Sequence, residues 1–341
     1  MSGIAFQPSM AADFSRSVLP DLHQIADPAK LATMFNDPRQ FWVQTNPLLS
    51  AFVWSMLLSV VVFIVSEVND NYSQVDRLWP FLPTGYTLHF LAWAYYHRLD
   101  SPRLWTLAGL HVVWTCRLFW NYYRKGGYSK GSEDYRWPYI RKNWRFFSNP
   151  TFFRFFNFAF ICVAQNLLHL AIATPAYIVL LVSRDVGPRA GDAFAVEAFV
   201  LSLFLEGYAD EQQWEFQSMK KKFLEYPEDQ RPERLGGFTR KQLERGFNTH
   251  GLFAWSRHPN FIAEQLIWIS FYAIGCTASG IWLNWTIVGC LSYCILFQCS
   301  TRLTEEISCG KYPAYQKYQK QVGMFVPTGK SWDEAVDGKE E

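Results

Sequence analysis

The stretch PLLSAFVWSMLLSVVVFIVS, residues 47–66, decides the fold class of this chain. It is 20 residues long and carries no charged side chain. A helix needs roughly 20 residues to cross the hydrocarbon core of a bilayer, so this stretch predicts a membrane-spanning helix. Three further uncharged runs occupy residues 78–96, 155–182 and 276–301. The sequence therefore predicts a protein embedded in a membrane.

Three weaker apolar segments bring the predicted number of spans to seven. The segments 104–123, 193–209 and 261–275 are apolar apart from isolated polar groups. We expect an all-α fold, a polytopic transmembrane helix bundle of about seven spans. A soluble all-α bundle with unusually apolar helices is the alternative.

The predicted domain boundaries follow the apolar runs. Residues 1–46 form an N-terminal tail without the apolar segment of a cleaved signal peptide. The transmembrane domain occupies residues 47–327, and a charged C-terminal tail occupies residues 328–341.

Lysine and arginine residues set the predicted orientation. The segment 124–154 holds eight of them and the segment 210–258 holds nine, whereas residues 277–285 hold none. Because basic connections stay on the cytosolic side, we expect both basic segments to be cytosolic. Seven spans then place the C-terminus in the cytosol and the N-terminus on the opposite side.

Composition excludes several function classes. The formal net charge is only +2, which lacks the strong basic excess of a nucleic-acid-binding protein, so no nucleic-acid partner is expected. The seven cysteines form no CxxC pair, and most lie in apolar runs. Buried, reduced cysteines are therefore expected, and no metal site.

Ionisable residues collect near the predicted cytosolic ends of the spans, where such groups mark functional sites. In LEGYADEQQWEF, residues 205–216, Glu206 and Asp210 are four positions apart and share a helix face. Two carboxylates on one face repel each other unless a cation or a ligand donor lies between them.

The stretch WSRHPNFIAEQ, residues 255–265, places a second group of polar residues at the start of an apolar helix. Arg257 and His258 precede Pro259, and proline is favoured in the first turn of a helix. A basic pair beside free N–H groups is typical of a phosphate site. Asn260 and Glu264 share the next helix face and can bind the amide or ribose of a nucleotide.

A third polar cluster lies in CSTRLTEEISCGKYPAYQKYQ, residues 299–319. Arg302 and Glu306 are four positions apart and can pair with each other. Tyr312 begins a row of tyrosines after the last span, as is common at a membrane interface.

Taken together and in this order, these blocks resemble the steroid 5-alpha-reductase-like superfamily of membrane reductases, most closely its DUF1295 branch. The resemblance covers roughly residues 50–327. It is carried by GLFAWSRHPNFIAE and EGYADEQQWEF, and by the blocks VDRLWP (75–80), RLFWNYYRKGGYSKGSEDYRW (117–137) and EEISCGKYPAYQKYQKQVGMFVP (305–327).

The resemblance implies that NADPH binds in a cytosol-facing cavity formed by the C-terminal half, about residues 193–327. It places Arg257 and His258 beside the cofactor and adds Glu206 and Glu306 as further candidates. The implied cofactor contacts are Asp210, Asn260, Glu264, Arg302 and Tyr312.

For the chemistry, the resemblance implies reduction of a C=C bond. The steroid enzymes polarise an enone carbonyl with a glutamate and a tyrosine on early helices. Asp76 matches the glutamate, whereas Trp114 occupies the tyrosine position. Asp76 is therefore the first candidate acid, and Tyr122 or Tyr123 the second.

We accordingly expect an NADPH-dependent reductase of a steroid- or lipid-like substrate, an integral membrane protein of the endoplasmic reticulum with its active site facing the cytosol. One alternative is an S-adenosylmethionine-dependent membrane methyltransferase of the isoprenylcysteine or phospholipid type. Those enzymes share an Arg-His-Pro turn and a paired-Glu segment. The other alternative is a lipid-binding member of the fold without catalysis.

Overall fold

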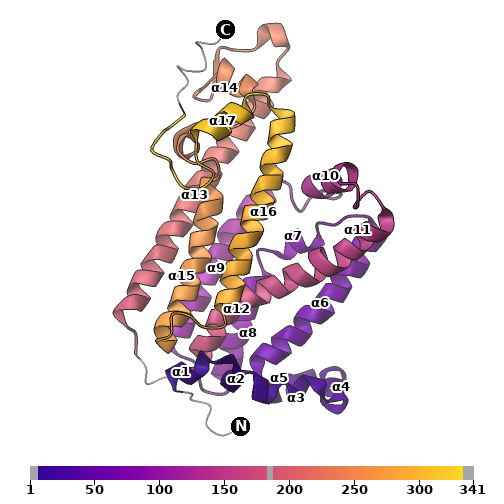
Figure 1. Cartoon of the computed structure of the whole chain (residues 1–341), viewed down its shortest axis with the longest axis vertical. Helices are drawn as coiled ribbons and strands as arrows, with labels where there is room; N and C mark the ends of the chain where they lie inside the picture. Colours follow the sequence, from indigo (N-terminus) through magenta and orange to yellow (C-terminus); the bar gives the residue numbers. More distant parts are fainter. Residues whose placement is uncertain (1–6, 183–186, 333–341) are drawn as a thin grey trace. The chain divides into compact units, whose positions relative to one another are not determined.

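The structure, a computed structural model, describes residues 7–182 and 187–332, which are helical apart from one short hairpin (Figure 1). It forms two compact units, each described by itself. The N-terminal unit comprises Met1–Ala198 and Trp268–Cys294, and the C-terminal unit comprises Phe199–Ile267 and Ile295–Glu341. Of the predicted tails, residues 1–6 and 333–341 lie outside the described residues.

The elements, in chain order, are α1 (Pro8–Ala11), α2 (Phe14–Ser17), η1 (Leu19–Asp21), α3 (His23–Ala26), α4 (Pro28–Asn36), α5 (Pro38–Gln44), α6 (Pro47–Asn69), α7 (Gln74–Leu78), α8 (Leu82–Tyr96), α9 (Pro102–Arg124), α10 (Arg136–Asn143), α11 (Pro150–Phe156), the π-helix η2 (Asn157–Ala164), α12 (Gln165–Leu181), α13 (Ala190–Glu225), η3 (Glu228–Gln230), β1 (Arg234–Leu235), β2 (Phe238–Thr239), α14 (Arg240–Arg245), η4 (Gly251–Ala254), α15 (Pro259–Ser279), α16 (Ile287–Lys311) and α17 (Tyr315–Gln321).

Within the described residues, four helical stretches are long and apolar enough to cross a membrane: Pro47–Asn69, Pro150–Leu181, Pro259–Ser279 and Ile287–Lys311. Their length and composition confirm the prediction of an α-helical membrane protein. The other three predicted spans are helical too, as α8, α9 and the first part of α13.

Helix α6 shows why these helices suit a bilayer. Its buried face carries serines, with Ser55 and Ser59 almost fully enclosed, whereas Val61 and Val68 are 54% and 78% exposed. A soluble protein would place the valines inside and the serines outside. In a membrane, lipid covers the apolar face, and small residues let neighbouring helices approach closely.

The boundary between the last two predicted spans lies later than the sequence indicated. We expected one span to end at residue 275 and the next to begin at residue 276. Helix α15 instead continues to Ser279, and α16 begins only at Ile287. Gly280, with φ +74°, ends α15 in the left-handed conformation that glycine favours. The side chain of Asn284 then accepts the backbone N–H of Thr286, 3.1 Å away, and fixes the turn.

Helix α12 lies at the centre of the N-terminal unit and contacts α6, α8 and α9. The α16 backbone also approaches it closely at Gly289. A Cβ atom at Gly289 would lie 2.3 Å from the carbonyl oxygen of Ala171, so only glycine fits there. On α15, Gly275 faces Pro175 of α12 in the same way. Small residues at such crossings are typical of helix packing in membranes.

The residues predicted as an N-terminal tail form the short helices α1–α5, which are anchored to the unit by buried hydrogen bonds. Asn46 donates from its side chain to the hydroxyl of Tyr177 at 2.8 Å, and that hydroxyl donates to the carbonyl of Ser17 at 3.0 Å. The carboxamide of Gln24 accepts the backbone N–H of Asn46 at 2.7 Å. This region is therefore part of the folded unit.

Candidate functional site

The C-terminal unit carries the residues that the sequence assigned to the cofactor. Its loop between α14 and α15 is held from two sides. The side chain of Gln212 on α13 accepts the backbone N–H of Leu252 at 2.9 Å. On the other side, the N–H groups of Arg257 and His258 donate to the carbonyls of Gly323 and Met324 at 2.9 and 3.0 Å. These contacts fix the backbone just before α15 begins.

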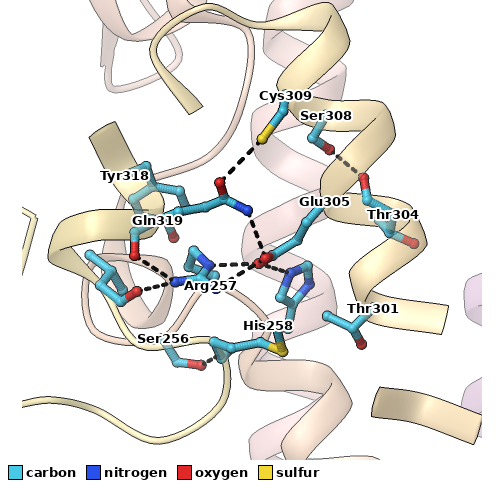
Figure 2. Close-up of polar contacts among 12 residues, drawn as sticks. Ser256, Arg257, His258, Thr301, Thr304, Glu305, Ser308, Cys309, Tyr318 and Gln319 are labelled. Atoms are coloured by element: carbon cyan, nitrogen blue, oxygen red, sulfur yellow. Dashed lines mark hydrogen bonds and ion pairs between the residues drawn. The ribbon is translucent and has the colours of Figure 1, made fainter. Parts of the chain in front are cut away.

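The side chain of Arg257 forms a two-point ion pair with Glu305 of α16 (Figure 2). Its Nε lies 2.6 Å from Oε1 and its Nη2 lies 3.0 Å from Oε2. Arg257 is 9% exposed and Glu305 is 4% exposed. Because a guanidinium and a carboxylate are both planar, this paired arrangement is the strongest that they form.

Further donors complete the shell around Glu305. His258 approaches Oε1 through Nε2 at 2.9 Å, and the side-chain amide of Gln319 donates to Oε2 at 2.9 Å. Arg257 uses Nη1 to donate to the backbone carbonyls of Gln319 and Val322. We expected a phosphate as the partner of Arg257 and His258. In the structure both side chains contact a buried protein carboxylate, which joins the turn before α15 to α16 and, through Gln319, to α17.

Glu305 and Gln319 are not among the site residues predicted from the sequence. The available signal was the adjacent acidic pair Glu305–Glu306, from which Glu306 was chosen. Helix geometry turns neighbouring residues about 100° apart, so one of the two faces inward. Glu305 is buried and Glu306 is exposed, as is the predicted cofactor residue Arg302.

A second cluster joins α13 to α15. The side-chain amide of Asn260 donates to Oδ1 of Asp210 at 3.2 Å. Glu206 lies one turn from this contact on α13, and Glu264 lies one turn from it on α15. Glu206, Asp210 and Glu264 are only 5%, 4% and 4% exposed. Three buried carboxylates beside one amide form a set of acceptors suited to hydroxyl and amide N–H groups of a ligand.

The third cluster surrounds Tyr312. Lys220 of α13 donates to the Tyr312 hydroxyl at 2.9 Å and to the carbonyl of Gly246 at 2.6 Å. The ammonium of Lys311 lies 5.3 Å from the ring centre. Burial acts to raise the pKa of Tyr312, but the hydrogen bond and charge of Lys220, helped by Lys311, outweigh it and lower that pKa. The cluster therefore favours negative charge.

The candidate acids belong to the N-terminal unit. Asp76 lies on α7, where its carboxylate accepts the indole N–H of Trp137 at 3.0 Å. Burial raises the pKa of Asp76, the charge of Asp134 raises it further, and Arg136 opposes both. This direction agrees with the expected behaviour of a proton donor.

The two tyrosine candidates on α9 differ in their surroundings. Tyr122 is half-buried and packs edge-on against Tyr128, with ring centres 4.9 Å apart. Tyr123 is 56% exposed. Of the two, Tyr122 therefore lies in the more enclosed surroundings.

In the part of the chain that the structure describes, no three His, Cys, Asp or Glu side chains are grouped so that they could hold a metal ion. A shallow hollow of about 650 Å³ in the N-terminal unit is lined by Trp42, Ala92, Tyr95, Tyr96, Arg98 and Asp100. None of the predicted site residues lines this hollow.

Comparison with known proteins gives two matches. The profile of the family described as "Protein of unknown function (DUF1295)" matches residues 62–322. The chain is also similar to the Uncharacterized protein C594.04c of Schizosaccharomyces pombe, with 42% identity over 333 residues, covering 97% of this chain and 94% of the relative. No solved structure matches the chain.

Proposed function

The chain belongs to the DUF1295 family, and from that premise we propose that it is an NADPH-dependent reductase of a C=C bond in a steroid- or lipid-like substrate within the membrane. One observation carries the proposal most directly. The Asp210–Asn260 contact joins two helices that each present a further buried glutamate, Glu206 and Glu264. Together these side chains gather acceptor oxygens on two neighbouring helices, which favours a ligand rich in hydrogen-bond donors.

The residues present suit the parts of NADPH. The carboxylates of Asp210 and Glu264 would accept from ribose hydroxyls or the carboxamide, while Lys220 and Lys311 beside Tyr312 would bind phosphate oxygens. When bound, the cofactor supplies a hydride to the alkene. The protein supplies a dry environment and an acid that protonates or stabilises the far end of the conjugated system, for which Asp76 is our candidate.

Arg257 and His258 act in this proposal as positioning residues. Because both contact Glu305, they fix the first turn of α15 against α16. Asn260 and Glu264 lie in that turn and the next one. Loss of the Arg257–Glu305 contact would therefore displace cofactor-binding side chains without removing any of them.

The proposal includes the finer topology: seven spans, the C-terminus in the cytosol, and residence in the endoplasmic reticulum. The part of this topology that puts residues 67–77 and 124–154 on one side of the membrane is supported by contacts between these two connections. Asn71 donates to the carbonyl of Ser132 at 3.0 Å, and the Glu133 carboxylate accepts the Tyr72 backbone N–H at 2.8 Å. Because Asn71 begins an Asn-x-Ser sequon, a glycan at Asn71 would contradict this topology.

The test is ligand-dependent thermal stability of detergent-purified protein. NADPH at a concentration well above its Kd should raise Tm, because a ligand that binds only the folded state stabilises it. Asp210→Asn and Asn260→Ala should reduce the shift, whereas Glu215→Gln, which alters an exposed carboxylate on the same α13, should retain it. Absence of any NADPH-dependent shift in the wild-type protein would overturn the proposal.

A second candidate function is the S-adenosylmethionine-dependent methyltransferase. The Arg257–Glu305 pair is consistent with it as well, because this contact joins the Arg-His-Pro turn to the paired-Glu segment that both enzyme classes share. Stabilisation by S-adenosylmethionine but not by NADPH would select this function. A lipid-binding role without catalysis would give neither shift.

A further inference from the structure

One histidine in the N-terminal unit is buried without a polar partner. His169 of α12 is 0% exposed, and neither of its ring nitrogens has a hydrogen-bond partner in the structure. A neutral imidazole always carries one N–H donor and one acceptor nitrogen. The ring packs perpendicular to Trp79, with centres 4.3 Å apart, a contact that offers at most a weak N–H···π interaction.

A continuous row of aromatic rings leads away from His169. Trp79 is followed by Tyr293 at 5.9 Å, and Tyr293 by Trp268 at 5.7 Å, measured between ring centres. Trp268 lies 5.1 Å from His111, which closes the row with a second histidine. Tyr293, Trp268 and His111 are at most 1% exposed, so the row runs through the interior of the unit.

The second histidine is also incompletely paired. Nδ1 of His111 lies 2.7 Å from the hydroxyl of Thr87, but its Nε2 has no partner. On α12, the carboxamide oxygen of Gln165 is buried and unpartnered as well, one turn from His169 on the same helix face. The row therefore has unused hydrogen-bonding groups at both ends and apolar rings between them.

Buried polar groups such as these lower the stability of the folded protein unless a hydrogen-bond partner binds them. An ionisable side chain inside a membrane protein is, in addition, a functional-site hypothesis by default. His169 alone leaves one donor and one acceptor unused. Leucine or phenylalanine would fill the position without this cost, so the retained imidazole indicates a ligand.

We propose that this row, from His169 through Trp79, Tyr293 and Trp268 to His111, binds a largely apolar, ring-containing molecule drawn from the membrane, with a carbonyl or hydroxyl oxygen hydrogen-bonded to His169. The aromatic rings supply flat apolar surfaces for stacking, and the imidazole supplies the polar contact. Identification of this molecule as the substrate rests on the proposed reductase function. Binding itself does not, so it is measured without NADPH.

The first experiment compares the stability of ligand-free variants in detergent. His169→Phe and His169→Leu remove the unpaired nitrogens, and each should raise Tm by about 2–4 °C. His89→Phe is the matched control, because Nε2 of His89 is already bonded to the Pro47 carbonyl at 2.9 Å. The control should lower Tm. A lower Tm in both His169 variants would show that the imidazole already has a structural partner, such as a buried water, and would overturn the proposal.

The second experiment measures equilibrium binding of radiolabelled cholest-4-en-3-one and of its oxygen-free analogue cholest-4-ene. The wild-type protein should bind the ketone about tenfold more tightly, since one hydrogen bond separates the two probes. Both His169 variants should bind the two probes equally, and His89→Phe should keep the preference. No binding of the ketone by the wild-type protein, or an unchanged preference in the His169 variants, would overturn the proposal. An NADPH result of either sign would leave this outcome unaffected.

Discussion

Arg257 and Glu305 lie 48 positions apart in the sequence and meet in a nearly buried two-point contact, with N–O distances of 2.6 and 3.0 Å. The contact joins the residues just before α15 to the C-terminal part of α16, and His258 and Gln319 bind the same carboxylate. Three residues from two other segments of the C-terminal unit thus bind one negative charge. These contacts hold the residues just before α15, and Asn260 lies in the first turn that follows them.

Removal of Arg257 should therefore destabilise the protein strongly. Arg257→Ala leaves the Glu305 carboxylate buried without its main partner, and breaking a buried pair in this way costs about 3–5 kcal/mol. Thermal unfolding in detergent measures the loss, with Arg302→Ala as the control, since Arg302 is exposed on the same α16. Equal effects of the two substitutions would show that the ion pair contributes little.

How far the sequence predicts this fold depends on how local each signal is. The run 47–66 predicted a membrane helix correctly, because length and hydropathy are local properties. The end of α15 was misplaced because Gly280 and Asn284, which form the turn, lie within a continuous apolar run.

In the candidate site, too, residues marked by a local sequence pattern were predicted, and partners that only the folded chain brings together were missed. The polar residues of α13 and α15 were found from i, i+4 spacing, and the structure brings Asp210 and Asn260 into contact. The partner of Arg257 was not found, because no local pattern distinguishes Glu305 from Glu306 before the helix is oriented. His169 was missed for a related reason, since one histidine in an apolar run shows nothing about its partners.

Gly246 should not tolerate a side chain. It ends α14 with φ +87°, and a Cβ atom there would lie 2.5 Å from the ring of Tyr312. Gly246→Ala should therefore lower the unfolding free energy by more than about 1 kcal/mol, through both backbone strain and displacement of the ring. It should also weaken any NADPH-dependent Tm shift, because Lys220 bonds both Gly246 and Tyr312.

Gly310→Ala provides a control of opposite sign. Gly310 lies within α16, and a Cβ atom there would meet no atom within 4 Å. Alanine is favoured over glycine by about 0.8–1.0 kcal/mol in a helix interior. Gly310 is the last residue but one of α16, so the gain should be smaller there, but this variant should still be more stable than the wild type. If both glycine variants moved stability in the same direction, the steric argument for Gly246 would fail.

Asp76 should make stability and turnover depend on pH. Its pKa is raised in the folded state, so folding favours the protonated carboxyl group. The unfolding free energy of the wild type should therefore fall, relative to Asp76→Asn, as pH rises from the ordinary aspartate value of 3.8 through the raised folded value. Besides burial, the groups that act on this carboxyl are Asp134, Arg136, the indole N–H of Trp137 and the side chain of Ser73.

The same variant tests the acid assignment. Asp76→Asn should abolish most turnover of an enone substrate while retaining the NADPH-dependent Tm shift, because Asn cannot release a proton. Glu215→Gln, which changes an exposed carboxylate, controls for removal of negative charge. Unchanged turnover in Asp76→Asn would show that another residue is the proton donor. Tyr122→Phe would then test the half-buried Tyr122.

The final prediction concerns a buried ion pair that no sequence pattern indicated. Within the N-terminal unit, Arg103 of α9 contacts Asp192 of α13 at 3.0 Å through Nε and 2.7 Å through Nη2, and their side chains are only 7% and 10% exposed. The hydroxyl of Thr277 on α15 donates to the same carboxylate.

Arg103→Met alone should cost about 3–5 kcal/mol of unfolding free energy, because it leaves a buried charge unpaired. The double variant Arg103→Met with Asp192→Leu should recover much of that loss, since apolar side chains of similar size replace both charges. Thermal unfolding of Arg103→Met, of Asp192→Leu and of the double variant gives the coupling between the residues. A double variant as unstable as the sum of the single ones would show that the two side chains act independently.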